Sequence, residues 1–326
     1  MHKKTWLWMM LSVAVVSFAS CSSEPELKYQ GTTFEPVDTA EILITESPSD
    51  DGNSRVVVQA GPEAEIGIYP EAIVSLSPSS TEILFAIGAG SSVIAVDDQS
   101  NYPPEAPLVE GLSGWNVNIE AVASFEPDLV IVSDSDIQEE LEVLGIRVFV
   151  ASAPDEFGDL FQQIFAIGEV TGNTDGAHDL VASIQREMFE LTEDLKQLPM
   201  PLTYYHELDD TLYTATGTTF IGQIYALAGL ENIADAVDEE GSSFGYPQLT
   251  QEFIFEADPD IIFFADAKCC GQSFETISDR PGWSDLKAVK NGNVIEINSD
   301  ISSRWGPRLV DFLSVVTSAV SAVNSQ

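Results

Sequence analysis

Residues 118–134 read NIEAVASFEPDLVIVSD, and residues 250–266 read TQEFIFEADPDIIFFAD. Each stretch opens with a short helical pattern, turns at a proline, and ends in a continuous apolar run. Such a run is typical of a strand that is buried on both faces of a parallel sheet. Because the two stretches occupy matching places in the two halves of the chain, they predict one α/β unit in each half.

The sequence around both stretches continues the alternation of strand and helix, which indicates lobes built on parallel sheets. In the first half, Ser79 or Ser80 is expected to cap a helix, and Glu82 to place an acid in its first turn. Strands are predicted at 72–77, 93–97, 147–152, 202–207 and 293–298, and helices at 79–90, 137–145, 219–230 and 306–323. Between the halves, residues 157–198 have no strand signal, and apolar residues at helical spacing predict a long helix within 175–198.

The chain has 326 residues, with 13 Lys+Arg against 53 Asp+Glu and a formal net charge of −40. This length suits two domains of ordinary size. So strong an acidic excess repels phosphate groups and offers no basic stripe, which excludes nucleic-acid binding. The charge itself is typical of a solvated acidic surface.

The N-terminus resembles that of an exported bacterial lipoprotein. MHKK is followed by an apolar run of signal-peptide length, and Phe18-Ala19-Ser20-Cys21 resembles the site at which a cysteine receives diacylglycerol. An ordinary signal peptide with a chance cysteine is the alternative. We expect a protein that is exported and lipid-anchored at Cys21 to the bacterial cell membrane, facing the periplasm or the cell exterior.

These patterns predict a division of the chain into five parts. The acidic Ser/Pro-rich segment after Cys21 predicts a flexible spacer, in which EILIT and RVVVQA are a possible hairpin. The parts are a signal peptide (1–20), a lipidated cysteine with a linker (21–65), an N-terminal α/β lobe (66–172), an interlobe helix (173–199) and a C-terminal α/β lobe (200–326).

Two further groups of residues leave their roles open. Cys269 and Cys270 are adjacent, so they are either free thiols or a vicinal bridge, and their spacing makes a poor zinc site. The segment YYHELDD (204–210) offers possible iron or haem ligands in His206, Glu207, Asp209 and Tyr204 or Tyr205. In a strand, His206 and Tyr204 share one face and Glu207 and Tyr205 the other, so no full ligand set converges locally. An exposed strand end is the alternative interpretation of that segment.

Several motifs resemble the solute-binding proteins of ABC importers for metal chelates, a class that covers cobalamin, ferric siderophores and haem. They are IVSLSPSSTEILFAIGAG (73–90), SNYPPEA (100–106), SGWNVNIEAVASFEPDLVIV (113–132), YTATGTTFIGQIYALAGLENIA (213–234), YPQLTQEFIFEADPDII (246–262) and RPGWSDLKAVKNGNVIEI (280–297). SNYPPEA, SGW and SDISSRWGPR (299–308) are most similar to cobalamin binders. The resemblance implies two Rossmann-like α/β lobes joined by a single long backbone helix, with the ligand in a cleft between them.

The resemblance also implies which residues bind. Aromatic faces would bury a flat macrocycle, and a few polar groups would fix its orientation. The implied ligand-binding residues are Ser79, Tyr102, Trp115, Tyr213, Tyr246, Asp300, Arg304 and Trp305. Residues 301–303 lack the bulky aromatics that cobalamin binders carry there. Glu120 and Glu252, one in each lobe, are implied to dock on arginines of a permease dimer that works with its ATPase.

The resemblance implies a monomeric protein without a catalytic site, a resident metal or a cofactor, whose bound ligand is a small-molecule metal chelate. No GxSxG, GxxxxGK[ST] or HExxH motif indicates an enzyme. Two alternatives remain: a siderophore or haem binder of the same transporter class, and a scaffold lipoprotein that has kept the bilobal fold.

Overall fold

The computed structural model describes residues 27–29, 32–34, 69–134, 136–193, 195, 201–238 and 241–325. The first two ranges form an antiparallel pair, β1 (Leu27–Tyr29) and β2 (Thr32–Phe34), inside the predicted linker. Short β-prone runs account for this pairing, which the sequence analysis did not predict. The predicted signal peptide, Cys21 and the EILIT/RVVVQA hairpin lie outside the described residues.

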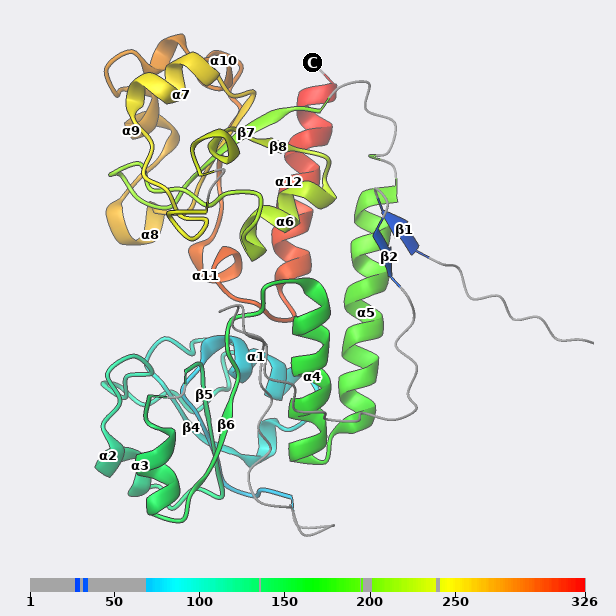
Figure 1. Cartoon of the computed structure of the whole chain (residues 1–326), viewed down its shortest axis with the longest axis vertical. Coiled ribbons are helices and arrows are strands. Elements are labelled where there is room, and N and C mark those ends of the chain that lie inside the picture. Colours follow the sequence, from blue (N-terminus) through cyan, green and yellow to red (C-terminus); the bar gives the residue numbers. More distant parts are fainter. Residues whose placement is uncertain are drawn as a thin grey trace, which may run out of the picture. The chain divides into compact units, whose positions relative to one another are not determined.

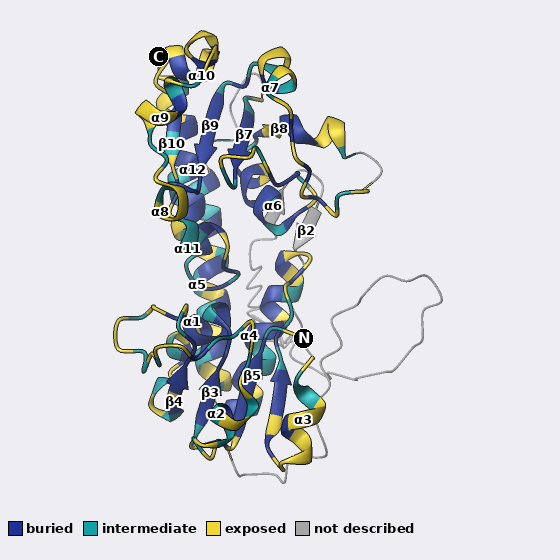
Figure 2. Ribbon diagram, turned by 90° about the vertical axis from the view of Figure 1, so that its left-hand side faces the viewer, coloured by how far each residue is buried: buried dark blue, intermediate teal, exposed yellow. Residues whose placement is uncertain are grey.

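The N-terminal lobe contains a four-stranded parallel sheet in the order β4-β3-β5-β6 (Figure 1). The first stretch quoted above forms α2 and β5, as predicted. Both faces of the sheet are covered, so its strands are largely buried (Figure 2). The elements of this lobe are β3 (Ile73–Ser75), α1 (Pro78–Ala86), η1 (Gly90–Ser92), β4 (Val93–Val96), α2 (Ile119–Ala123), β5 (Leu129–Val132), α3 (Gln138–Val143) and β6 (Arg147–Val150).

The C-terminal lobe repeats this plan with a parallel sheet in the order β10-β9-β7-β8. The second quoted stretch forms α7 and β9, again as predicted. The elements are β7 (Thr203–Glu207), α6 (Phe220–Leu227), β8 (Glu231–Asn232), η3 (Ile233–Val237), α7 (Gln251–Ala257), β9 (Ile261–Phe264), α8 (Ala267–Cys270), α9 (Phe274–Ser278), η4 (Trp283–Asp285), α10 (Lys287–Lys290), β10 (Val294–Glu296) and α11 (Ser299–Ser302). The predicted fold of two parallel-sheet α/β lobes is confirmed.

Three longer helices run beside the lobes (Figure 1). They are α4 (Phe157–Thr171), α5 (Thr174–Thr192) and α12 (Leu309–Asn324). The interlobe helix predicted at 173–199 overlaps α5, which begins just after Gly172 adopts a left-handed φ of 74° and ends α4. Helix α5 packs on both α4 and α12. The interlobe boundaries at 173 and 199 remain a prediction, since residues 196–200 lie outside the described part of the chain.

The start of α1 differs from the prediction. The N-cap is Ser77, whose side chain accepts a hydrogen bond from the Ser80 amide, and Pro78 occupies the first helical position. Neither Ser79 nor Ser80 caps the helix. Because the helix starts early, Glu82 lies beyond its first turn and is almost completely buried. Its carboxylate therefore acts through tertiary contacts, described below.

The segment YYHELDD is not an exposed strand end. Strand β7 lies inside its sheet between β9 and β8, and its residues 204–207 are fully buried. His206 Nδ1 lies 2.7 Å from the Tyr225 hydroxyl, and burial lowers the pKa of His206 to about 4. Glu207 pairs with both terminal nitrogens of Arg280 at 2.6 Å. These side chains serve the core of the lobe, so His206 and Tyr204 are not placed to ligate iron in a cleft.

Candidate functional site

The candidate site lies on loops that follow the carboxyl ends of the strands in both sheets. In open parallel sheets this edge is where ligands bind, because the loops and helix N-termini there are free to vary. In the N-terminal lobe the relevant loop joins β4 to α2. In the C-terminal lobe the loops follow β7, β9 and β10, together with the connection from η3, after β8, to α7.

The loop after β4 is anchored by Asp97. Its carboxylate accepts hydrogen bonds from the Gln99 amide at 2.8 Å and the Ser100 hydroxyl at 2.7 Å. Burial raises the pKa of Asp97, although these hydrogen bonds oppose the shift. Ser100 also accepts a hydrogen bond from Thr81 of α1. The segment that carries Tyr102 is therefore fixed to the body of the lobe.

Trp115 stands on the same loop and is 93% exposed. The Ser113 hydroxyl accepts hydrogen bonds from the amides of Trp115 and Asn116. Gly114 packs so closely that a Cβ there would lie 2.5 Å from the Leu76 carbonyl oxygen. A turn held by these contacts thus presents a large aromatic ring to solvent.

Tyr213 and Tyr246 are brought together in the C-terminal lobe. Residues 213–216 pair antiparallel with 245–248: the Thr214 amide donates to the Pro247 carbonyl and the Thr216 amide to the Gly245 carbonyl. The two tyrosines are diagonal neighbours across this pairing and are 43% and 44% exposed. Burial raises the pKa of Tyr246, so its phenol is neutral at physiological pH.

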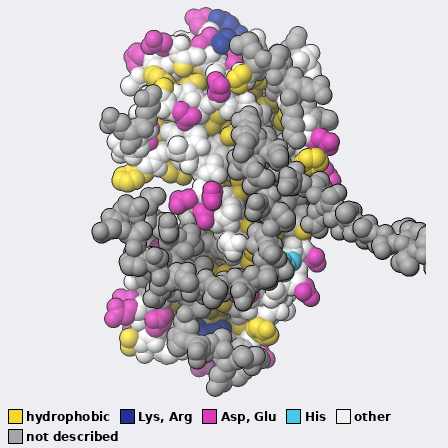
Figure 3. Space-filling model, turned by 45° about the vertical axis from the view of Figure 1, so that its right-hand side comes forward, with side chains coloured by type: hydrophobic (Ala, Val, Ile, Leu, Met, Phe, Trp, Pro, Cys, Tyr) yellow, Lys and Arg dark blue, Asp and Glu magenta, His cyan; other side chains and the backbone are white. Residues whose placement is uncertain are grey.

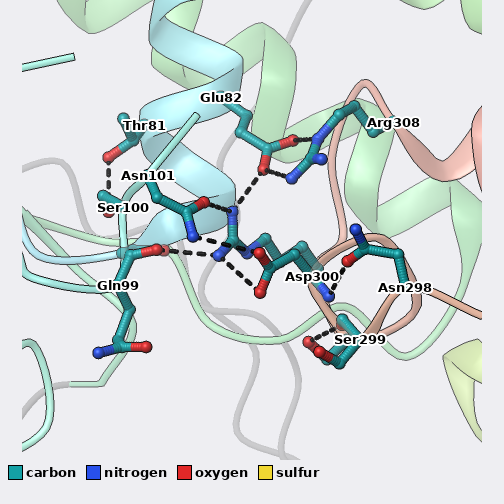
Figure 4. A network of polar contacts seen from close by, with 12 residues as sticks. Thr81, Glu82, Gln99, Ser100, Asn101, Asn298, Ser299, Asp300 and Arg308 are labelled. Atoms are coloured by element: carbon teal, nitrogen blue, oxygen red, sulfur yellow. Dashed lines mark hydrogen bonds and ion pairs between the residues drawn. The ribbon is translucent and has the colours of Figure 1, made fainter. Parts of the chain in front are cut away.

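A polar network connects the two lobes through the predicted pair Asp300 and Arg304 (Figure 4). Arg304 donates to Glu82 at 3.0 Å, to the Asn101 side chain at 3.1 Å and to the Gln99 carbonyl at 2.9 Å. Asp300 accepts hydrogen bonds from Asn101 and Lys268 and pairs with Arg304. Burial works against its ionised form, but the bonds from Asn101 and Lys268 and the charge of Arg304 lower the pKa of Asp300.

Arg308 completes this network and covers Tyr102. It donates to both carboxylate oxygens of Glu82, at 2.9 and 2.5 Å. The hydrogen bond to Glu82 raises the pKa of Arg308. Its guanidinium carbon lies 4.2 Å from the ring centroid of Tyr102, a cation–π contact. One face of the Tyr102 ring is thereby occupied within the protein.

The remaining predicted ligand residues lie beside this network. Ser79 is buried, and its carbonyl oxygen lies 3.6 Å from where a Cβ on Gly306 would be. Trp305 is partly buried, and its indole N–H has no hydrogen-bond partner within the described residues. The structure thus joins Tyr102, Asp300 and Arg304 in one network and places Tyr213 beside Tyr246, while Trp115 projects alone from its own loop.

The two predicted docking glutamates occupy equivalent positions. Glu120 lies in the first turn of α2 and Glu252 in the first turn of α7, and both are exposed. The view in Figure 3 shows how acidic the described surface is, with few Lys or Arg side chains visible. Cys269 and Cys270 form a vicinal disulfide on α8, which decides between the two alternatives left by the sequence.

Sequence reasoning missed Glu82 and Arg308 as an interlobe pair, and Gln99 and Asn101 as partners of Arg304. Asn101 lies within the quoted SNYPPEA motif, Gln99 directly precedes it, and Arg308 ends the SDISSRWGPR motif, so proximity to motifs was an available signal.

Across the described ranges, no helix has the length and apolar character needed to cross a membrane. In the same part of the chain, no cluster of three or more His, Cys, Asp or Glu side chains is arranged to hold a metal ion.

Residues 73–301 match the family model described as a periplasmic binding protein. The chain is 30% identical over 325 residues to the uncharacterized ABC transporter substrate-binding lipoprotein YvrC of Bacillus subtilis, covering 95% of each protein. It is 28% identical over 260 residues to a cobalamin-binding protein of Halobacterium salinarum, covering 77% of this chain and 69% of that one.

Solved structures share the fold. The vitamin B12 binding protein BtuF of Vibrio cholerae superposes with a TM-score of 0.63 at 24% identity, over 79% of this chain and 99% of that one. A possible iron-binding solute-binding protein of Staphylococcus epidermidis gives a TM-score of 0.67 at 23% identity, over 78% of this chain and 99% of that one.

Proposed function

Because the chain belongs to the periplasmic binding protein family, we propose that it is the substrate-binding lipoprotein of an ABC importer, which captures a corrinoid and delivers it to the membrane permease. The name of the Bacillus subtilis relative supports the transporter class, and that of the Halobacterium salinarum relative supports the corrinoid. The family consists of binding proteins, so we assign no reaction to the site.

The observation that carries the proposal is the set of aromatic rings on the carboxyl-edge loops of both sheets. Tyr102, Tyr213 and Tyr246 are each nearly half exposed, and Trp115 is almost fully exposed. Exposed aromatic side chains bury much area at low entropic cost when they meet a flat ligand. Asp300 and Arg304 supply charge-assisted hydrogen bonds for the amide side arms of a corrinoid.

Isothermal titration calorimetry of the purified full chain tests the proposal. Cyanocobalamin, haem and a set of ferric siderophores are titrated separately under one buffer condition. We expect one-to-one binding of cyanocobalamin with a submicromolar Kd. A clear preference for a siderophore would exclude the corrinoid but keep the transporter class, and no binding in the whole panel would support the scaffold lipoprotein instead.

Haem is the second candidate ligand, and a specific observation favours it. The phenols of Tyr213 and Tyr246 are partly exposed, and a tyrosine oxygen can ligate haem iron. His206 is not available for this role because it is buried in β7. A charge-transfer band that disappears in Tyr213→Phe or Tyr246→Phe would identify direct ligation.

The proposal also covers how the protein docks on the permease and how it is attached to the membrane. We assign permease docking to Glu120 and Glu252, whose equivalent exposed positions fit two matching permease subunits. We assign lipid attachment to Cys21, so that this lipid alone would hold the protein at the membrane. Labelling with a radioactive fatty acid in cells, lost in Cys21→Ser, tests the anchor.

A further inference from the structure

Phe244 combines two unusual properties. Its side chain is 90% exposed, and its backbone adopts a left-handed φ of 52°. Bulky residues rarely adopt this conformation, because Cβ crowds the neighbouring carbonyl. A glycine would relieve the crowding, and a polar residue would suit the solvent. Neither property stabilises the fold, so both point to a role for the ring in contact with another molecule.

Asp238 holds the loop in this conformation. Its Oδ1 accepts hydrogen bonds from the Ser243 amide at 2.8 Å and the Ser242 hydroxyl at 3.4 Å, and its Oδ2 accepts one from the Gly245 amide at 2.9 Å. These bonds, that of the Ser243 amide first, lower the pKa of Asp238. The carboxylate is therefore ionised at neutral pH and fixes the residues on both sides of Phe244.

The loop adjoins both the tyrosine pair and the contact between the lobes. Gly245 pairs with Thr216 and packs on Thr219, the N-cap of α6. The next residue, Phe220, meets Phe157 of α4 edge to face, with ring centroids 5.2 Å apart. Phe157 is the first residue of α4, the helix that follows the carboxyl end of β6. The loop thus lies near where the carboxyl-edge loops of both lobes meet.

We propose that Phe244 is a specificity-determining residue of the ligand site, which lays its ring on the flat face of the macrocycle beside Tyr246. Asp238 is the positioning residue for that ring. This inference rests on the proposed function. It explains why the chain keeps a strained, exposed aromatic residue: the ring gains its apolar contacts only when a large planar ligand is bound.

Three variants of Phe244 test it by calorimetry against cyanocobalamin and haem, with thermal unfolding in parallel. Phe244→Ala should weaken binding of the preferred ligand about tenfold, the loss expected for one buried ring. Phe244→Gly should weaken binding at least as much while leaving Tm unchanged or higher, since glycine tolerates the left-handed conformation. Phe244→Tyr should restore most of the affinity, because it keeps the flat ring.

Phe255→Ala is the matched control, since Phe255 is a partly exposed phenylalanine near the end of α7, the helix that leads into the amino end of β9. It should leave affinity unchanged. Asp238→Ala should weaken binding less than Phe244→Ala and add nothing when both are combined. Wild-type affinity in Phe244→Ala, with the wild-type protein binding its ligand, would overturn this inference alone. Failure of the wild-type protein to bind any ligand of the panel would overturn the proposed function together with it.

Discussion

Glu82 and Arg308 lie 226 residues apart in the chain and form a bidentate ion pair between α1 of the N-terminal lobe and the start of α12. Arg304 donates to the same carboxylate. The side chains of Glu82, Arg304 and Arg308 are 1%, 8% and 17% exposed. One buried carboxylate thus forms ion pairs with two arginines and connects the lobes beside the candidate site.

Removing the charge of Glu82 should destabilise the protein. Glu82→Gln removes the carboxylate that pairs with the largely buried Arg308 and leaves Arg304 with the carboxylate of Asp300, and breaking a buried pair in this way typically costs about 3–5 kcal/mol. Urea unfolding should show this loss as a lower midpoint. Glu252→Gln, at an exposed position, is the control and should change stability by less than about 0.5 kcal/mol. An unchanged midpoint in Glu82→Gln would contradict a stabilising role for the pair.

Asp266 should make stability depend on pH. It is fully buried after β9, neither carboxylate oxygen has a hydrogen-bond partner within the described residues, and burial, with the charge of Glu207 adding to it, raises its pKa to about 7. The folded state therefore binds a proton that the unfolded state releases above its ordinary pKa of 3.8. This group's contribution to stability decreases as the pH rises from about 4 to 7.

Asp266→Asn imitates the protonated carboxyl and should remove that dependence. At pH 8 its Tm should exceed that of the wild type by about 3–5 °C, and at pH 4 the two should coincide. Differential scanning calorimetry at both pH values measures the gap. A gap that is the same at both pH values would mean that Asp266 does not titrate in this range.

Trp115→Ala should separate binding from stability. The side chain is 93% exposed, so its removal costs the folded state little, and Tm should stay within about 1 °C of the wild type. Affinity for cyanocobalamin should decrease about tenfold if the ring covers the ligand. Isothermal titration calorimetry measures the affinity, and differential scanning calorimetry measures the Tm. If Trp115→Ala unfolds the protein instead, the residue belongs to the core.

Reversing the two docking charges should block delivery without affecting capture. Glu120→Lys with Glu252→Lys should abolish stimulation of the reconstituted transporter's ATPase, because two attractive contacts become repulsive. Ligand affinity should be unchanged, since neither exposed glutamate belongs to the aromatic set or to the polar network proposed to hold the ligand. Glu139→Lys, an exposed acid in the first turn of α3, controls for the loss of negative charge. Normal stimulation in the double variant would remove the docking assignment.

The amino-acid sequence by itself determined the α/β plan of both lobes. Buried strands and amphipathic helices are encoded by local periodicity, so β5, β9, α5 and α12 could be predicted from short windows. The family motifs also identified Tyr102, Trp115, Tyr213 and Tyr246, which the structure places on carboxyl-edge loops. Local patterns were less reliable at element boundaries, as the cap at Ser77 demonstrates.

Only the tertiary structure decided which charges meet and which strand is internal. No local pattern brings Glu82 to Arg304 and Arg308 across more than 200 residues, because that contact depends on how the lobes pack. The same holds for His206, whose burial follows from the neighbours of β7 and not from its own segment. Strands and helices are specified by patterns of neighbouring residues, whereas the environment of a charge depends on the residues that the folded chain brings around it.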